Sequence, residues 1–474
     1  MAKKSYEKPP ISKGDELDIE IMDLAYGGDS VGRYKNFTVF IPYGVPGSLV
    51  RARITELKKN FASGKILRVI TESPAYTKPV CPYFGECGGC DWMNIKYTAQ
   101  VQYKHKFVKF MLEKSAGLPN VEVGQPITFD NPLYYRNRAQ YKAAIEDGVV
   151  KMGFYRARSH EVIGVDKCMI LQPKINEIAA VITKAFNERK KEISLYDEKS
   201  NRGYLRHVAI RVNMKGESLV TFVVNGRDIQ PFISYAAEAV RLNVQGLKGT
   251  VLNTNTEPGN NVFSDREKTI YGQPYITERA AGIDFNLNSS SFFQVNALSL
   301  EKMAAFVKEN IKPGAKVLDL YGGVGALTLP SRDKFREIFV VEIDTGAAQR
   351  LHEMTVRNNY HNVTVVNGRA EDAVDKFMND VRITDLVIDP PRKGIHPKIL
   401  AAIRRSKIEN IVYISCNPAS FARDINELKD NYFVAEVQTL DQFPQTYHVE
   451  LMARLEKKKA GREAEQNARP HHRF

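Results

Sequence analysis

Four of the five cysteines in this 474-residue chain have a spacing that suggests a metal centre. Cys81, Cys87 and Cys90 form a C-x5-C-x2-C cluster, and Cys168 follows at a distance. A disulfide scaffold would be shorter and far denser in cysteine. Zinc ligands are usually paired more evenly than this, but the spacing alone leaves both zinc and an iron–sulfur cluster open.

The fifth cysteine, Cys416, could act as a nucleophile. It lies in Ser415-Cys-Asn-Pro, directly after an apolar run, where a thiolate can be exposed and activated. Its alternative role is that of a small buried hydrophobe. Glu450 precedes the last apolar run, Leu451–Leu455. A thiolate that adds to C6 of uracil makes C5 reactive towards a methyl sulfonium, and a carboxylate can then remove the C5 proton.

Alternating apolar strands and helical stretches must position these residues from about residue 280 onwards. Continuous apolar runs of this kind predict a parallel, doubly wound α/β sheet, with strands expected at 316–320, 338–342, 363–366, 385–389 and 411–415. Ligands of such sheets bind beyond the carboxyl ends of the strands. The residues expected at those ends are Tyr321, Glu342, Asp389 and Cys416.

The Gly-rich segment Asp319–Gly325 is expected to turn the first of these strands into a helix. A dinucleotide fingerprint would need glycine at Thr328, so the segment does not predict a diphosphate ligand. A sulfonium cofactor has no diphosphate and needs no diphosphate-binding site. Glu342 is placed to accept hydrogen bonds from ribose hydroxyls, with a solvated strand end as the alternative.

The N-terminal part contains short strands separated by turns. Strands expected near 17–22, 38–42, 49–54 and 65–70 predict a small OB-like barrel. It is followed by a helix over 97–115 and a β-rich centre with a helical insert at 174–191. Two segments of that centre, 134–138 and 154–158, alternate aromatic rings with arginines and could stack on bases, or they could be core rings beside surface arginines.

Composition and charge favour a soluble intracellular enzyme with an anionic partner. The net charge is +13, and such a surplus suits a phosphate-bearing partner. No apolar run approaches the roughly 20 residues of a membrane span, and no signal sequence is recognisable at the start. We therefore expect RNA as the partner, without DNA or a membrane, and a monomer.

With these motifs the chain resembles the RNA (uracil-5-)-methyltransferases, in particular the branch that acts on 23S ribosomal RNA (the RlmD type). The matching blocks are Ser-Phe-Phe-Gln-Val-Asn (291–296), the Gly-rich turn, Asp389-Pro-Pro-Arg-Lys-Gly394, Ser415-Cys-Asn-Pro with Arg423-Asp424, and His448-Val-Glu450. The resemblance implies S-adenosylmethionine as cofactor, held by Gln294, Tyr321, Glu342 and Asp389. It further implies Cys416 as nucleophile, Glu450 as base, and a structural [4Fe–4S] cluster on Cys81, Cys87, Cys90 and Cys168.

The expected fold is therefore a multidomain α/β protein, with a TRAM-type barrel, a β-rich central domain with the iron–sulfur site, and a Rossmann-like methyltransferase sheet. The expected division is a flexible arm 1–13, the barrel 14–74, the central domain 75–92 with 125–275, the methyltransferase domain 93–124 with 276–456, and a basic tail 457–474. Two other functions stay open. One is a uridine of transfer RNA as target, and the other is a non-catalytic ribosome-assembly factor, against which intact Cys416 and Glu450 argue.

Overall fold

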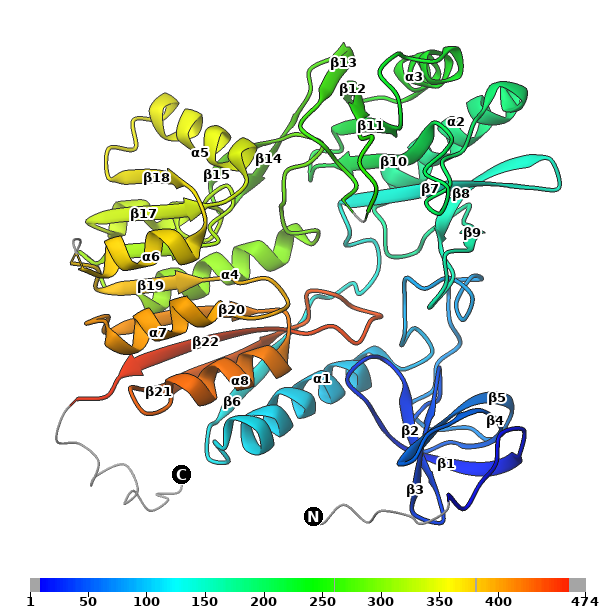
Figure 1. Ribbon diagram of the computed structural model, residues 1–474, viewed down its shortest axis with the longest axis horizontal. Coiled ribbons are helices and arrows are strands. Elements are labelled where there is room, and N and C mark those ends of the chain that lie inside the picture. Colours follow the sequence, from blue (N-terminus) through cyan, green and yellow to red (C-terminus); the bar gives the residue numbers. More distant parts are fainter. Residues whose placement is uncertain (1–8, 260, 380–381, 460–474) are drawn as a thin grey trace.

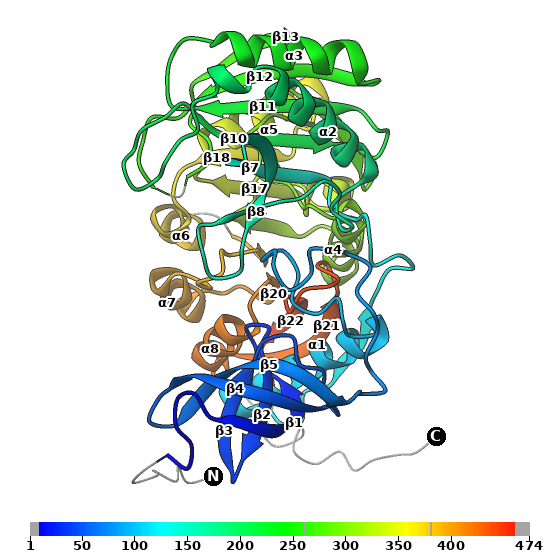
Figure 2. The ribbon, with the colours of Figure 1, turned by 90° about the vertical axis from the view of Figure 1, so that its right-hand side faces the viewer.

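Three main β-sheets and one two-stranded sheet organise the chain in the computed structural model, which describes residues 9–259, 261–379 and 382–459. A small barrel, a central sheet and a large sheet with helices on both faces form separate bodies (Figure 1). The view turned by 90° again places the barrel and the central sheet at opposite ends of the molecule (Figure 2). Within the described ranges no helix combines the length and hydropathy that crossing a bilayer requires.

The N-terminal barrel closes in the order β1-β2-β3-β5-β4. Its strands are β1 (Glu16–Leu24), β2 (Ser30–Tyr34), β3 (Phe37–Ile41), β4 (Leu49–Leu57) and β5 (Phe61–Thr71). Alternate side chains of β1, β3 and β4 are buried and fill its interior. Ile11 is 4% exposed and packs into this core, so the end of the expected arm belongs to the barrel. Residues 1–8 of that arm lie outside the described residues.

Two arginines on the barrel surface are paired with acidic residues of the same barrel. Arg51 pairs with Asp18 at 2.6 Å, and Arg53 pairs with Glu16 at 2.6 Å, across the β1–β4 ladder. These arginines are at least one-third exposed, so the pairs add little stability but reduce the charge available to RNA.

A long segment joins the barrel to the rest. It contains the first three cysteines, helix α1 (Tyr97–Met111) and a π-helical turn (Leu112–Ala116). The next strand, β6 (Val123–Ile127), pairs with the edge of the large sheet, so the expected start of the central domain at residue 125 was two to three residues early.

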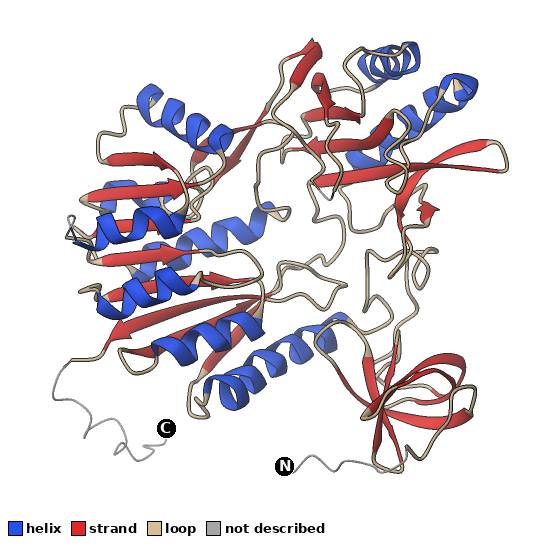
Figure 3. Cartoon of the chain, viewed as in Figure 1, coloured by secondary structure: helices blue, strands red, loops and turns tan. Residues whose placement is uncertain are grey.

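The central sheet has seven strands in the order β13-β12-β11-β10-β7-β8-β9. Helices α2 and α3 pack against each other and against this sheet, and their apolar faces supply its core (Figure 3). The bounds are β7 (Arg138–Glu146), β8 (Val149–Tyr155), β9 (Val162–Gly164), α2 (Pro173–Glu188), a 3-10 turn (Lys190–Glu192), β10 (Leu205–Val212), β11 (Ser218–Val224), α3 (Pro231–Asn243), β12 (Leu247–Thr254) and β13 (Glu267–Gly272).

The large sheet follows the hairpin β14 (Ile276–Ala280) and β15 (Ile283–Leu287), and has the order β18-β17-β16-β19-β20-β22-β21-β6. Its remaining strands are β16 (Lys316–Leu320), β17 (Glu337–Glu342), β18 (Val363–Asn367), β19 (Asp385–Ile388), β20 (Asn410–Ser415), β21 (Tyr432–Leu440) and β22 (Glu450–Lys457). The strands from β18 to β20 are parallel, as expected, whereas β22 runs antiparallel to both its neighbours. The sheet is therefore mixed and not wholly parallel.

Helices bury both faces of this sheet, as a doubly wound fold requires. One apolar core includes side chains of α1, α6, α7 and α8, and the other includes those of α4 and α5. The bounds are α4 (Ala297–Asn310), α5 (Thr345–Arg357), α6 (Ala370–Asn379), α7 (Pro397–Arg405) and α8 (Pro418–Leu428). The Gly-rich turn after β16 leads into a helix, as expected, and this helix is a short 3-10 helix (Leu329–Lys334). The expected tail from residue 457 begins inside β22, and residues 460–474 are not described.

Candidate active site

A cavity of about 1160 Å³ lies at the carboxyl ends of the parallel strands. All six residues expected from the sequence to bind the cofactor or act in catalysis line it: Gln294, Tyr321, Glu342, Asp389, Cys416 and Glu450. Four of them follow or end β16, β17, β19 and β20. Glu450 reaches the same edge because β22 is antiparallel and begins there.

Cys416 and Glu450 are brought together by strand register. Ser415 at the end of β20 pairs with Leu451 of β22. The next position in that register places Cys416 opposite Glu450, and residues that face each other in this way lie on the same face of a sheet. Residues that are 34 positions apart in the sequence are therefore neighbours in the cavity wall.

The charges around Cys416 are mostly negative. Burial, followed by Glu450 and Asp389, raises the pKa of its thiol to about 11, against the opposing effect of Arg392. Burial and Asp389 likewise raise the pKa of Glu450 well above its ordinary value. Burial also raises the pKa of Asp389, to about 7. A positive charge brought into the cavity would lower the pKa of the thiol and of both carboxyl groups.

The Gly-rich turn and Glu342 fit each other. The backbone N–H of Gly323 donates to Glu342 Oε2 at 2.8 Å, and that of Asp344 donates to Oε1 at 2.7 Å. Gly323 has a φ of +57°, and nothing lies within 4 Å of the position of a Cβ there, so the backbone is open to a ligand. Each carboxylate oxygen retains a free lone pair, and Glu342 can still accept a hydrogen bond from a ligand hydroxyl.

Gln294 is held by a residue that the sequence analysis did not single out. Gln442 Nε2 donates to Gln294 Oε1 at 2.5 Å, and both side chains are at most 9% exposed. The Gln442 Oε1 atom is buried without a partner among the described residues. Such an atom is costly unless a ligand or water satisfies it, which fits a polar ligand in this part of the cavity.

The loop before Glu450 is clamped by helix α1. Lys104 is buried and donates to Asp441 Oδ1 at 2.6 Å and to the Phe443 carbonyl at 3.0 Å. Gln100 exchanges two hydrogen bonds with Gln445, at 2.9 and 3.0 Å. Removing one partner of such a buried pair leaves an unpaired charge, so this contact fixes the loop strongly. The sequence near Gln100 and Lys104 does not indicate this role, because their partners are more than 330 residues away in the chain.

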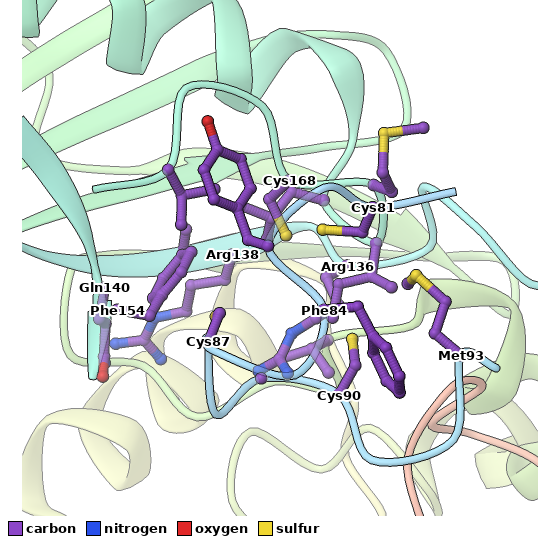
Figure 4. Close-up of a pocket in the computed structure, with 18 residues that line it drawn as sticks. Cys81, Phe84, Cys87, Cys90, Met93, Arg136, Arg138, Gln140, Phe154 and Cys168 are labelled. Carbon is purple, nitrogen blue, oxygen red and sulfur yellow. The ribbon is translucent and has the colours of Figure 1, made fainter. Parts of the chain in front are cut away.

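A second cavity, of about 300 Å³, contains the four remaining cysteines in its lining. Figure 4 shows Cys81, Cys87, Cys90 and Cys168 around it, with Phe84 and Met93 among the other lining residues. No histidine, aspartate or glutamate lines this cavity. Over the described ranges, no three His, Cys, Asp or Glu side chains are close enough to hold a single metal ion. The three clustered cysteines and Cys168, which is distant from them in the sequence, therefore line one cavity.

Several side chains of the aromatic and arginine segments, 134–138 and 154–158, have partners within the protein. The Tyr135 hydroxyl donates to the Pro444 carbonyl at 3.1 Å, and Arg138 donates to the Ser289 carbonyl at 2.7 Å. Arg156 pairs with Glu161, and Phe154 stacks on the buried ring of Tyr141. Tyr135, Arg138 and Phe154 are therefore held by contacts within the protein, while Arg158 is exposed, so RNA contact by the remaining side chains stays a prediction.

The fold and the cavity define a methyltransferase, and comparisons with known proteins give its class. Residues 96–458 match the tRNA (uracil-5-)-methyltransferase family, and residues 11–67 match the TRAM domain. Uncharacterized RNA methyltransferases of Clostridium acetobutylicum and Halalkalibacterium halodurans are 34% and 33% identical to the chain. They cover 94% and 96% of it, and the alignments span 98% and 100% of those relatives.

A solved structure extends the likeness to three dimensions. The tRNA (uracil-54, C5)-methyltransferase of Pyrococcus abyssi, in complex with S-adenosyl-L-homocysteine, superposes with a TM-score of 0.72 at 25% identity. The superposition covers 92% of this chain and 99% of that one. The protein is thus an S-adenosylmethionine-dependent RNA methyltransferase with an N-terminal TRAM domain. More particularly, the chain belongs to the tRNA (uracil-5-)-methyltransferase family.

Proposed function

We propose that this enzyme methylates C5 of a uridine in 23S ribosomal RNA through a covalent bond between Cys416 and C6 of the base. The observation that carries this proposal is the register that sets Cys416 opposite Glu450 at the edge of one cavity. A nucleophile and a base are both needed at one uracil ring, and these two residues are adjacent.

The proposed reaction begins when the Cys416 thiolate adds to C6 and forms an S–C6 bond. The C5–C6 electron pair then becomes part of an enolate. C5 takes up the methyl group as the bond between that methyl group and the cofactor sulfur breaks, and neutral S-adenosyl-L-homocysteine is the leaving group. Glu450 removes the C5 proton, the C5–C6 double bond re-forms, and the S–C6 bond breaks to return the thiolate. Bound S-adenosylmethionine supplies the methyl group on a positively charged sulfur.

Gln294, Tyr321, Glu342 and Asp389 are the residues that we propose to hold the cofactor. Glu342 is oriented by two backbone N–H groups and keeps free lone pairs for ribose hydroxyls. Gln294 lies beside the unpaired oxygen of Gln442. A positive sulfonium would also act on Cys416 in the same direction as Arg392, which lowers the pKa of the thiol.

Ribosomal RNA is the favoured target because the chain has a TRAM domain and a four-cysteine cavity, which the resembled 23S branch combines. Transfer RNA is the second candidate, since the Pyrococcus abyssi structure is named as a tRNA enzyme. In a strain that lacks the gene, we expect 5-methyluridine to disappear from one position of 23S ribosomal RNA and to return with the intact gene. Mass spectrometry of ribosomal and transfer RNA from this strain distinguishes the two targets. Loss of 5-methyluridine from transfer RNA alone would overturn the ribosomal assignment.

We also propose that Cys81, Cys87, Cys90 and Cys168 hold a [4Fe–4S] cluster with a structural role. Four cysteine thiols line one cavity, and four cysteine thiolates are the usual ligands of this group. The segment that follows Cys90 contacts the loop before Glu450. The backbone N–H groups of Asp91 and Trp92 both donate to the Gln445 carbonyl at 3.0 Å.

Protein purified without oxygen is accordingly expected to be brown and to contain about four irons per chain. Serine at Cys87 should lower the iron content and the melting temperature, whereas serine at Cys416 should leave the iron unchanged. Metal analysis and visible absorbance provide the measurement. One zinc per chain with no iron would show that the cavity binds a different metal.

A further inference from the structure

The turn between β1 and β2, residues 25–29, is fixed against the rest of the protein. The Trp92 indole N–H donates to the Gly28 carbonyl at 3.0 Å, and Arg158 pairs with Asp29 at 2.6 Å. Gly28 has a φ of +96°, and a Cβ there would lie only 3.0 Å from the Asp91 carboxyl group. The barrel therefore presents this turn to the catalytic domain in one defined position.

Tyr26 at the centre of this turn connects the barrel to the active site through a row of rings. Its ring meets that of Tyr447 edge to face, with centroids 5.5 Å apart, and that of Phe107 at 6.0 Å. Tyr447 lies against His448, with centroids 4.1 Å apart. His448 lines the large cavity and is 3.3 Å from Arg392. The row thus runs from the barrel to the cavity that contains Cys416.

The Tyr26 hydroxyl has no role in this packing. Phenylalanine would make the same ring contacts, and the hydroxyl has no hydrogen-bond partner in the part of the chain that the structure describes. Burial raises the pKa of the Tyr26 hydroxyl; Tyr447, Cys416 and Glu450 raise it further, and Arg392 lowers it. This hydroxyl is therefore a half-buried polar group within electrostatic reach of the catalytic residues, and it is free to bond a ligand.

We propose that Tyr26 is a specificity-determining residue, whose hydroxyl hydrogen-bonds the target uridine nucleotide when that nucleotide enters the cavity. The inference rests on the proposed function and adds a substrate contact from the barrel. A uridine must leave its stack to reach a buried nucleophile, and carbonyl and phosphate oxygens of the nucleotide are suitable acceptors. The barrel then acts at the reacting base as well as on the surrounding RNA.

The test compares Tyr26→Phe with Tyr34→Phe, which removes a hydroxyl from a residue that packs against the barrel core. The probe is full-length 23S ribosomal RNA transcribed with 5-fluorouridine, and the readout is the rate of denaturant-resistant adduct formation at limiting RNA. We expect Tyr26→Phe to slow the adduct by roughly 2- to 10-fold, the range of one hydrogen bond. Melting temperature and S-adenosyl-L-homocysteine affinity should stay unchanged, and Tyr34→Phe should match the wild type.

The outcomes separate this inference from the function on which it rests. If the wild type forms no adduct with the fluorinated RNA, the covalent function fails. If the wild type forms it and Tyr26→Phe does so at the same rate, Tyr26 is only a packing residue and the inference is overturned. An equal loss in Tyr34→Phe would also overturn it, because the effect would then arise from the barrel as a whole.

Discussion

Replacing Cys416 by alanine is expected to abolish methyl transfer and adduct formation while RNA and cofactor still bind. Loss of a covalent nucleophile lowers turnover by on the order of 10⁴-fold or more. The substitution removes only a sulfur atom from a side chain at the cavity wall, so the fold should be retained. The measurement is transfer of a labelled methyl group to RNA, together with denaturing gels of the protein with 5-fluorouridine RNA.

Binding assays supply the control for this variant. Unchanged affinity for S-adenosyl-L-homocysteine and RNA would assign the loss to chemistry and not to misfolding. If Cys416→Ala still methylates RNA at a rate near that of the wild type, the covalent mechanism is wrong, and Cys416 is a packing residue.

Replacing Glu450 by glutamine is expected to trap the enzyme on its substrate. The thiolate can still add and C5 can still be methylated, but the C5 proton is removed slowly, with a loss of on the order of 10²- to 10⁴-fold. Glu450 is 3% exposed, and burial raises its pKa, so a neutral amide of the same shape leaves no buried charge unpaired. Methyl-labelled protein–RNA adduct should therefore accumulate on denaturing gels, and a stable fold is retained.

Glu436→Gln is a matched control, because Glu436 is exposed on β21 of the same sheet. It should release product at the wild-type rate. Rapid turnover without any trapped adduct in Glu450→Gln would assign proton removal to another group, and Asp389 would be the next residue to test.

The parallel part of the large sheet could be predicted from the sequence to within one residue per strand. Buried parallel strands appear as continuous apolar runs, and their ends then identify the cavity. This is why Tyr321, Glu342, Asp389 and Cys416 could be placed together without coordinates. Glu450 was recognised only from its motif, because its position depends on an antiparallel pairing that no local pattern reveals.

Features made by distant contacts could not be predicted. Strand β6 contains a glycine and a proline, and it is a strand only because it pairs with β21 at the sheet edge. The Lys104–Asp441 pair joins residues 337 positions apart. Arg138 and Tyr135 looked like surface readers of RNA because a sequence shows composition but not which side of a strand is covered. Pairing and burial decided each of these cases.

The place of β22 between β20 and β21 has a consequence for biosynthesis. Every other described strand of the large sheet is translated earlier, yet β21 and β6 connect to the rest of the sheet only through β22. The nascent sheet therefore remains in two pieces until residues 450–457 have left the ribosome. Because the same segment carries Glu450, a chain interrupted before it lacks both the proposed base and the strand that joins the two parts of the sheet. We expect chains that end before residue 450 to misfold and be degraded, so that they do not bind RNA as inactive enzyme.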